Sequence, residues 1–320
     1  MTDVIRLQYQ KRPSAVIALL KALWGIRRRY DILTDQAEIC AVWKKATMMP
    51  EHRKVFMEIC GLQADLSNDH PMDIIYPWTL VFPLVIRVLG HAEAPLTIFR
   101  SVTTKARIVQ SRKIGANGEM QAVCRLGDRR LVEKGLEADV LQSIELSDGI
   151  AWECRQTFFY KGRFGEPDKP CSLNVMPAIP DAPPIGEWFL PSGRGFRFAD
   201  ISGDSNGIHY SRTYARMLGF ERDFAQPMRI LSKALEFVPS TGNEPSASGK
   251  LEKPDPAGDK AANGQPDGGW NNCHSLDIAF KGPVYYNSRV EVRGASFHDG
   301  YRFDVYAGQN PRPCICAWLQ

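Results

Sequence analysis

Hydrophobic and polar positions form two successive patterns in the first half of the chain. An apolar segment, Thr79–Leu89, is preceded by Pro77 and closed by Gly90, which is typical of a buried central helix. Segments with strand-like composition follow, and turn residues such as Asp148-Gly149 separate them. The predicted strands are Thr97–Val109, Met120–Leu126, Leu136–Leu146 and Ala151–Tyr160. This order predicts one helix followed by an antiparallel meander.

The second half repeats this order without visible sequence identity. Between Met228 and Val238 the apolar residues recur with the spacing of one helix face, and Pro227 precedes them as Pro77 precedes the first helix. The strands predicted after this helix are Ser275–Phe280, Ser288–Arg293, Arg302–Tyr306 and Cys314–Leu319. We therefore expect an α+β protein in which one helix-and-sheet unit occurs twice.

The segment before the first unit has a helical composition. We interpret residues 1–62 as a helical N-terminal extension, with helices at Ala37–Lys45 and Glu51–Cys60. The apolar run Pro13–Ile26 is too short to span a bilayer, so we expect a helix that covers the sheet and no integral membrane segment.

Changes in amino-acid composition along the chain indicate the boundaries of the domains, the linker and an insertion. The first domain is expected at 63–170 and the second at 187–320, joined by a proline-rich linker at 171–186. Residues 239–269 are rich in Gly, Pro, Ser, Asp and Lys, and we expect them to form a disordered insertion in the second domain.

Overall composition narrows the class of protein. The chain has 320 residues, of which 44% are hydrophobic and 24% charged, as in soluble globular proteins. A net charge of +4 is compatible with phosphate-bearing ligands but is too small to indicate nucleic-acid binding. The eight cysteines are scattered without a C-x-x-C pair, which favours a reducing, cytoplasmic compartment.

The strongest candidate for chemistry is the stretch 202–209, Ser-Gly-Asp-Ser-Asn-Gly-Ile-His. It follows a strand-like segment, Gly195–Ala199, and precedes a predicted helix, Ser211–Leu218. Ser, Gly, Asp and Asn favour turns, so a bend here would bring Asp204 and His209 within reach of one water molecule. A carboxylate and a neutral imidazole that share a water can move its protons by general acid–base catalysis.

A purely structural interpretation also fits these two residues. Asp204 would then accept hydrogen bonds from neighbouring backbone amides, and His209 would be a half-buried histidine with satisfied nitrogens. The spacing by itself is weak evidence, because Asp65 and His70 have it too, without the preceding Ser-Gly. Their distance from Pro77 also differs from that between His209 and Pro227, so we expect one site rather than two.

The run from Phe196 to Val238 resembles the hydratase motif of the MaoC-like, (R)-specific enoyl-CoA hydratases. That motif reads S-G-D-x-N-P-x-H, then a short helix ending in Gly-Phe, then A-H-G-M at the start of the central helix of a hot-dog fold. The resemblance implies a double hot-dog protein whose catalytic residues are Asp204 and His209. The residues expected to contact the substrate are Asn206, Gly207, Gln226, Pro227 and Met228.

The chain departs from the family pattern at two places. Gly207 replaces the family's proline, which affects only the rigidity of the loop. Gln226-Pro227 replaces the family's His-Gly, whose glycine N–H donates to the thioester carbonyl oxygen. Pro227 has no N–H, and loss of one such donor can reduce the rate by ~10²–10³. The N–H of Met228 and the side chain of Gln226 are the candidate replacements.

The resemblance implies a hydro-lyase that adds water to a 2-enoyl thioester or dehydrates an (R)-3-hydroxyacyl thioester. It implies no metal or redox cofactor, because coenzyme A or a carrier protein arrives with the acyl thioester substrate. No nucleic-acid partner is expected, and a homodimer is compatible with this organisation. Two alternatives remain open at this stage. One is a hot-dog thioesterase, and the other is a catalytically silent thioester-binding subunit in which Pro227 marks lost activity.

Overall fold

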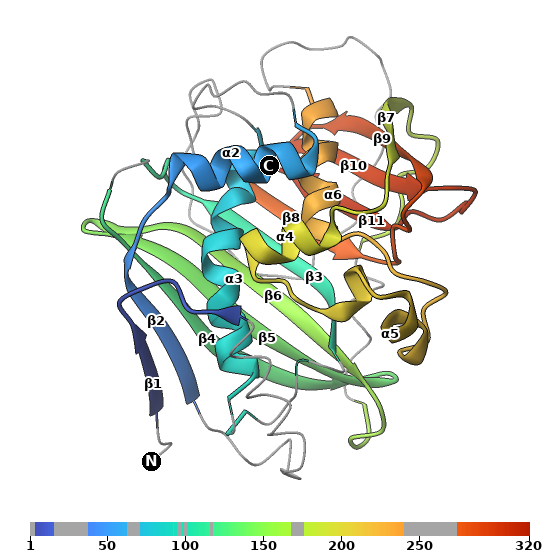
Figure 1. Cartoon of the computed structure of the whole chain (residues 1–320). Helices are drawn as coiled ribbons and strands as arrows, with labels where there is room; N and C mark the ends of the chain where they lie inside the picture. The colour runs from blue at the N-terminus through green and yellow to red at the C-terminus, as the bar shows by residue number, and fades with distance from the viewer. Residues whose placement is uncertain are drawn as a thin grey trace.

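The computed structural model describes residues 4–15, 38–62, 71–91, 93–94, 98, 101–115, 118–167, 176–239 and 274–320. Its named strands form one eleven-stranded sheet that curves around the helices (Figure 1). The order across the sheet is β1-β2-β4-β5-β6-β3-β8-β11-β10-β9-β7. This order divides the sheet into a first half, β1 to β6, and a second half, β7 to β11.

In the first half, helix α3 (Tyr76–Leu89) packs against the concave face of the sheet, mainly on β2, β4 and β5. The 3₁₀ turn η1 (Pro71–Ile74) leads into this helix. The strands of this half are β1 (Val4–Tyr9), β2 (Glu38–Ala46), β3 (Ser101–Gln110), β4 (Met120–Val132), β5 (Gly135–Leu146) and β6 (Gly149–Lys161). The helix followed by antiparallel strands confirms the sequence prediction for this half. Only β4, β5 and β6 form a meander, however, because β3 pairs with β6 and β8 and not with β4.

In the second half, helix α6 (Pro227–Ala234) continues into the 3₁₀ turn η5 (Leu235–Phe237), as predicted for Met228–Val238. The strands are β7 (Pro184–Leu190), β8 (His274–Phe280), β9 (Ser288–Phe297), β10 (Gly300–Ala307) and β11 (Ile315–Leu319). Four of them confirm predicted strands, whereas β7 was not predicted and begins inside the proposed linker. Residues 171–175 of that linker lie outside the described residues, as does the insertion from residue 240 onward.

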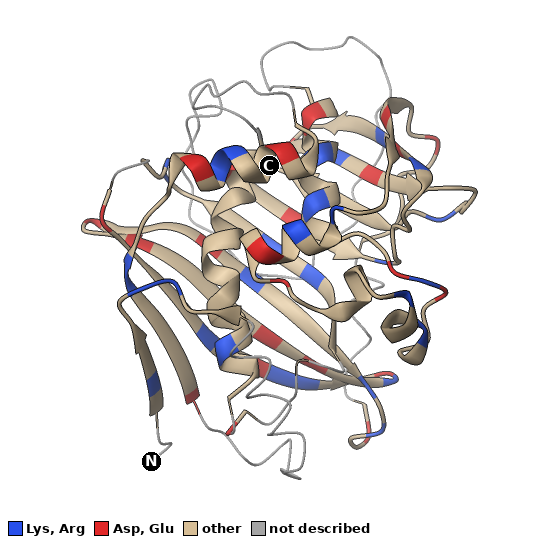
Figure 2. Cartoon of the chain, viewed as in Figure 1, with Lys and Arg blue, Asp and Glu red and all other residues tan. Residues whose placement is uncertain are grey.

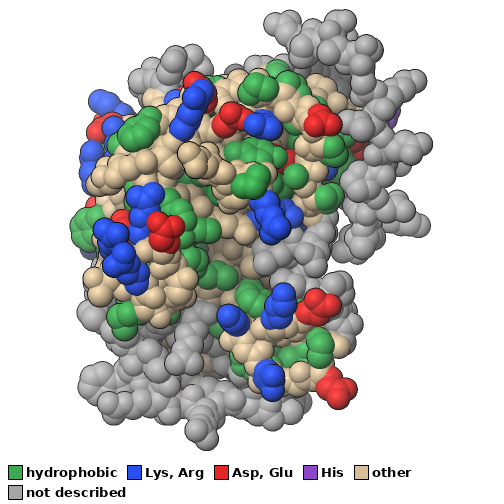
Figure 3. Space-filling view, turned by 90° about the vertical axis from the view of Figure 1, so that its right-hand side faces the viewer, with side chains coloured by type: hydrophobic (Ala, Val, Ile, Leu, Met, Phe, Trp, Pro, Cys, Tyr) green, Lys and Arg blue, Asp and Glu red, His purple; other side chains and the backbone are tan. Residues whose placement is uncertain are grey.

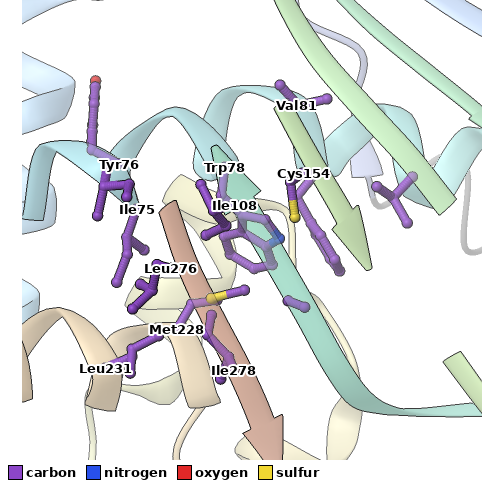
Figure 4. Close-up of a cluster of buried hydrophobic side chains, with 14 of the residues drawn as sticks. Ile75, Tyr76, Trp78, Val81, Ile108, Cys154, Met228, Leu231, Leu276 and Ile278 are labelled. Carbon is purple, nitrogen blue, oxygen red and sulfur yellow. The ribbon is translucent and has the colours of Figure 1, made fainter. Parts of the chain in front are cut away.

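The two halves are joined by antiparallel pairing of β3 with β8, from Lys105 opposite Ala279 to Gln110 opposite His274. Behind this seam, apolar side chains from both halves form one core (Figure 4). Trp78 of α3 and Met228 of α6 lie in the same cluster as Ile108 of β3 and Ile278 of β8. The halves therefore share a buried interior, and a site between them can draw residues from both.

Helix α3 contains Pro83, whose ring nitrogen has no hydrogen to donate to the carbonyl of Thr79 four residues earlier. Arg12 supplies the missing donor, with its Nη2 3.3 Å from the Thr79 oxygen. The window Met72–Leu89 is long and apolar enough for a membrane span, but 89% of it is buried in the protein. Such burial is what a central core helix requires.

The predicted helical extension is partly wrong. Ala37–Lys45 was expected to be a helix, but Glu38–Ala46 forms strand β2, paired in parallel with β1 and antiparallel with β4. Ile39, Ala41 and Trp43 face the core, so the period is two, and apolar residues on the other face concealed it. Helix α2 (Pro50–Cys60) confirms the other predicted helix. Most of Pro13–Ile26 lies outside the described residues.

The segment before the candidate motif was also predicted wrongly. Gly195–Ala199 was expected to be a strand, but it begins helix α4 (Gly195–Ser202). Phe196 and Phe198 suggested alternation, yet Phe196 is 67% exposed while Phe198, Ala199 and Ile201 are buried. That spacing buries one face of a helix. Helix α5 (Arg212–Met217) was predicted at Ser211–Leu218.

Candidate active site

The candidate loop begins where α4 ends at Gly203. Gly203 has a left-handed φ of 80°, and its N–H donates to the carbonyl of Ala199 at 2.8 Å. The Ser202 hydroxyl donates to the carbonyl of Phe198 at 2.6 Å and accepts from the N–H of Asp204 at 3.1 Å. A Cβ at position 203 would lie 2.9 Å from Cγ of Pro83, so the loop is seated directly on α3. The Ser-Gly pair thus sets the direction in which Asp204 leaves the helix.

Asn206 closes the loop and starts the 3₁₀ turn η4 (Gly207–His209). Its Oδ1 accepts from the N–H of Ile208 at 3.3 Å, which is N-terminal capping by a side chain. The backbone N–H of Asn206 donates to the carboxylate of Asp204. One residue therefore orients both ends of the motif, because it contacts Asp204 and begins the turn that carries His209.

The protonation pattern of His209 follows from its contacts. Its Nδ1 lies 3.0 Å from the carbonyl oxygen of Phe224, which can only accept, so Nδ1 carries the hydrogen. In the neutral ring, Nε2 then holds the lone pair, and it lies 3.6 Å from Oδ2 of Asp204. This distance is too long for a direct hydrogen bond. The two groups are thus neighbouring proton acceptors rather than a closed pair.

Tyr286 and Gly195 hold the backbone of His209 in place. The Tyr286 hydroxyl donates to the His209 carbonyl at 2.9 Å, and burial raises the pKa of this tyrosine to about 12, so it remains a donor. Gly195 passes so close that a Cβ there would lie 2.4 Å from the His209 oxygen. The imidazole is therefore fixed through both its ring and its main chain.

The environment of Asp204 makes its carboxylate a stronger proton acceptor than an exposed one. Burial raises the pKa of the carboxyl above its usual value of 3.8, while His209 and the Asn206 N–H act in the opposite direction. A carboxyl with a raised pKa exchanges protons closer to neutral pH than an exposed one does. This is the environment expected for a group that takes part in proton transfer.

Asp204 and His209 open onto a cavity of about 870 Å³ between the two halves. Its wall is mainly apolar, with Trp78, Phe82 and Phe158 from the first half and Met217, Phe224 and Phe280 from the second. A cavity of this size and composition accommodates an extended apolar ligand with a few polar anchors.

The structure brings most of the predicted site residues together, but not all of them. Asn206, Gly207, Pro227 and Met228 line the cavity with the catalytic candidates. Gln226 is not among the lining residues: it is fully buried, and its Nε2 donates to the carbonyl of Gly195 at 2.8 Å. Of the two candidate replacements for the glycine N–H, only Met228 therefore lines the cavity.

Pro227 and Met228 are the first two residues of α6. The first N–H groups of a helix have no carbonyl one turn earlier to bind, and the helix dipole places partial positive charge there. Because Met228 lines the cavity, this end of α6 can supply a donor to an oxygen held in it.

The residues that the first half contributes to the cavity were not predicted from the sequence. Trp78, Thr103 and Gln156 come from α3, β3 and β6, and they meet the loop only through tertiary packing. The alternation of β3 and β6 indicated which side chains face inward but not which of them reach a cavity.

Charged residues of both signs are distributed over the described elements. Lys and Arg are interspersed with Asp and Glu over the helices and strands (Figure 2). On the described part of the face in Figure 3, side chains of both signs lie among hydrophobic ones. Among the described residues, no group of three or more His, Cys, Asp or Glu side chains could hold a metal ion.

Similar proteins are found by sequence and by structure, although no known protein-family model matches the chain. The 3-hydroxyacyl-thioester dehydratase X of Mycobacterium tuberculosis is 25% identical over 223 residues, which are 68% of this chain and 76% of that protein. The crystal structure of HtdX from the same organism aligns with a TM-score of 0.65 and 17% identity, covering 88% of this chain and 98% of HtdX.

Two further structures have the same architecture. A MaoC-like dehydratase from Phytophthora capsici aligns with a TM-score of 0.65 and 16% identity, covering 91% of this chain and 97% of that one. Another M. tuberculosis protein, described as having a double hot-dog fold, aligns with a TM-score of 0.51 and 9% identity over 87% of this chain and 94% of that one. The predicted fold class is confirmed: the chain is a double hot-dog protein that resembles the MaoC-like dehydratases in sequence and in structure.

Proposed function

We propose that this protein is a hydro-lyase that interconverts (R)-3-hydroxyacyl and 2-enoyl thioesters. The observation that carries the proposal is the pair of acceptors at the cavity wall, Nε2 of His209 and Oδ2 of Asp204, 3.6 Å apart. The sequence relative named a 3-hydroxyacyl-thioester dehydratase supports the same reaction class.

The pair suits a single water molecule. Water has two O–H groups, and the two acceptors lie close enough together for each to receive one of them. In the hydration direction, one O–H bond breaks as the oxygen forms a bond to C3 of the enoyl group, and the proton passes to the pair. The pair returns a proton to C2, and dehydration follows the same steps in reverse. Because the two groups are coupled, they titrate together rather than as separate acid and base.

The electrons displaced from the C2–C3 double bond move onto the thioester carbonyl oxygen. In this proposal the N–H of Met228 donates to that oxygen, in place of the donor that Pro227 lacks. Donors of this kind act mainly on the charge that develops in the transition state, which is where they accelerate a reaction. No metal or redox cofactor has a part in these steps, and coenzyme A or a carrier protein would enter as part of the substrate.

The test is an assay with trans-2-octenoyl-CoA that records enoyl absorbance and free thiol in the same sample. We expect enoyl absorbance to fall without release of thiol, and 3-hydroxyoctanoyl-CoA of R configuration to appear by chiral chromatography. Release of thiol would instead support a thioesterase. Tight binding without any change over a range of acyl lengths would support a silent binding subunit.

A further inference from the structure

The cavity has a polar strip that the proposed reaction does not use. Ser101, Thr103 and Thr104 of β3 and Gln156 of β6 line the cavity on the side built by the first half. The catalytic pair belongs to the second half, so these groups are separate from the water site in sequence and in fold. Polar groups in an otherwise apolar pocket fix orientation and specificity, because leaving them unpaired against a ligand is unfavourable.

The strip exists because β3 is irregular at this point. Thr103 is opposite Phe158 and Lys105 is opposite Thr157, so Thr104 is an additional residue on β3, as in a β-bulge. Pairing of β3 with β8 also begins only at Lys105, opposite Ala279. The residues just beyond that pair, Thr104 on one strand and Phe280 on the other, both line the cavity. The bulge therefore turns hydroxyl groups into the space where the sheet opens.

The side-chain amide of Gln156 is held in one orientation. The indole N–H of Trp78, which can only donate, lies 3.1 Å from Oε1 of Gln156, and Nε2 of Gln142 lies 3.0 Å from the same oxygen. Gln156 is 2% exposed, so its amide cannot turn toward solvent. Its Nε2 must then face Thr103, and it donates to Oγ1 of that residue at 2.9 Å.

This contact determines what Thr103 offers to a ligand. Its hydroxyl oxygen accepts from Gln156, so its own hydrogen must be donated elsewhere. Among the described residues, the hydrogen bond that the structure shows for the Thr103 side chain is this one, in which Thr103 accepts. We propose that Thr103 is a specificity-determining residue that donates to an oxygen atom on the acyl chain of the thioester, beyond the reacting carbons. This inference rests on the proposed function for the identity of the ligand as an acyl thioester.

The chemical class of substrate follows from the direction of the hydrogen bond. A donor recognises a keto, hydroxyl or ether oxygen, and it rejects a methylene group at the same position, because the hydroxyl would be left without a partner. The preferred substrates are therefore acyl thioesters that carry an oxygen function on the chain. An unsubstituted chain of equal length fits the apolar wall but leaves the hydroxyl unpaired.

The test is a panel of 2-enoyl-CoA thioesters of one length that carry a single keto group at successive carbons, compared with the unsubstituted chain. We expect one keto position to give a kcat/KM about tenfold above the unsubstituted thioester. Thr103→Val should remove this preference, so that within this variant the keto thioester and the unsubstituted thioester have equal kcat/KM, and Thr103→Ser should retain it. Thr213→Val, the same change at an exposed position outside the cavity lining, is the matched control and should behave as the wild type.

A binding measurement tests this inference independently of the proposed reaction. Saturated keto-acyl-CoA thioesters cannot be hydrated, and calorimetry measures their affinity without turnover. A preference for one keto position that Thr103→Val abolishes would support the inference even if no enoyl thioester were hydrated. Equal kcat/KM and equal affinity across the panel, or a preference that survives in Thr103→Val, would overturn the inference while leaving the hydro-lyase function intact.

Discussion

The Nδ1 of His209 donates to the carbonyl oxygen of Phe224 at 3.0 Å, and the ring packs edge-on against the Phe224 side chain, with centroids 5.1 Å apart. This contact joins the motif loop to the segment that leads into α6, and it leaves Nε2 as the nitrogen that faces Asp204. The tautomer of a histidine is set by the partner of its other nitrogen. The segment before α6 therefore determines which nitrogen of His209 is available to a substrate.

Substitution of either member of the pair should abolish turnover. In Asp204→Asn and in His209→Ala, one of the two acceptors for the water is lost, and general acid–base groups of this kind contribute ~10²–10⁴ to the rate. We expect kcat/KM for the enoyl thioester to fall by at least about 10²-fold in each. Circular dichroism should show that both variants are folded, and activity near the wild-type value in either one would refute the assignment.

The same Asp204→Asn variant should be more stable than the wild type at neutral pH. Burial raises the pKa of Asp204 above 3.8, so the folded state binds this proton more tightly than the unfolded chain does. The group's contribution to stability is therefore complete below about pH 4 and is lost as the pH rises through the folded-state pKa. Asparagine does not ionise, so we expect a Tm about 2–4 °C higher near pH 7.

This stability difference should diminish toward pH 3, where both side chains are neutral. Differential scanning calorimetry between pH 3 and pH 8 measures it. A Tm difference that is constant over this range would show that burial of the carboxylate is not the cause.

Two glycines with similar φ angles allow the effect of left-handed backbone strain to be distinguished from the effect of a clash with α3. Gly203 and Gly219 have φ values of 80° and 88°, but a Cβ at 203 would lie 2.9 Å from Pro83, whereas nothing lies within 4 Å of one at 219. Alanine at either position should cost about 1–2 kcal/mol for the left-handed backbone. Only Gly203→Ala should also lower kcat, because relief of the clash displaces Asp204. Equal loss of activity in the two variants would contradict this.

The proximity of Asp204 and His209 could be predicted from the sequence because it depends on the residues between them. Asp204 and His209 are brought together by turn residues between them, and each of those residues has a conformational preference that can be read from its type. The two central helices and the strands that follow them were predictable for the same reason, since their periodicity persists over a whole element. Their order in the sheet was not, because β3 pairs with β6 and β8 pairs with β11.

The errors arose where tertiary context overrides local pattern. In β2, Cys40 and Val42 are apolar on the face away from the core, so the strand lacks clean alternation. In α4, two phenylalanines imitated a strand, although only Phe198 is buried. Thr103 and Gln156 could not be predicted as site residues, because the bulge and the indole of Trp78 that orient them depend on contacts between distant segments.

The residue at position 227 tests which backbone donor serves the thioester. Pro227→Ala introduces an N–H at the first position of α6 without changing the helix start. If Met228 already provides the donor, the added group is redundant, and kcat should remain within about threefold of the wild type. An increase of about 10²-fold, the effect of one oxyanion donor, would show instead that Pro227 limits the reaction.

Arg12 links α3 to the end of α4 and should matter for stability. Its Nη2 donates to the carbonyls of Thr79 and Ile201. Arg12→Met keeps the length of the side chain but removes the donors. Ile201 keeps a bond from Nε2 of His52 at 2.8 Å, whereas the fully buried Thr79 loses the donor that compensates for Pro83. One unsatisfied buried carbonyl should lower the free energy of unfolding by about 1–3 kcal/mol, measured by urea unfolding.

The exposed neighbour Lys11 is the control. Lys11→Met should change the free energy of unfolding by less than about 0.5 kcal/mol, and an equal effect in both variants would rule out this role for Arg12.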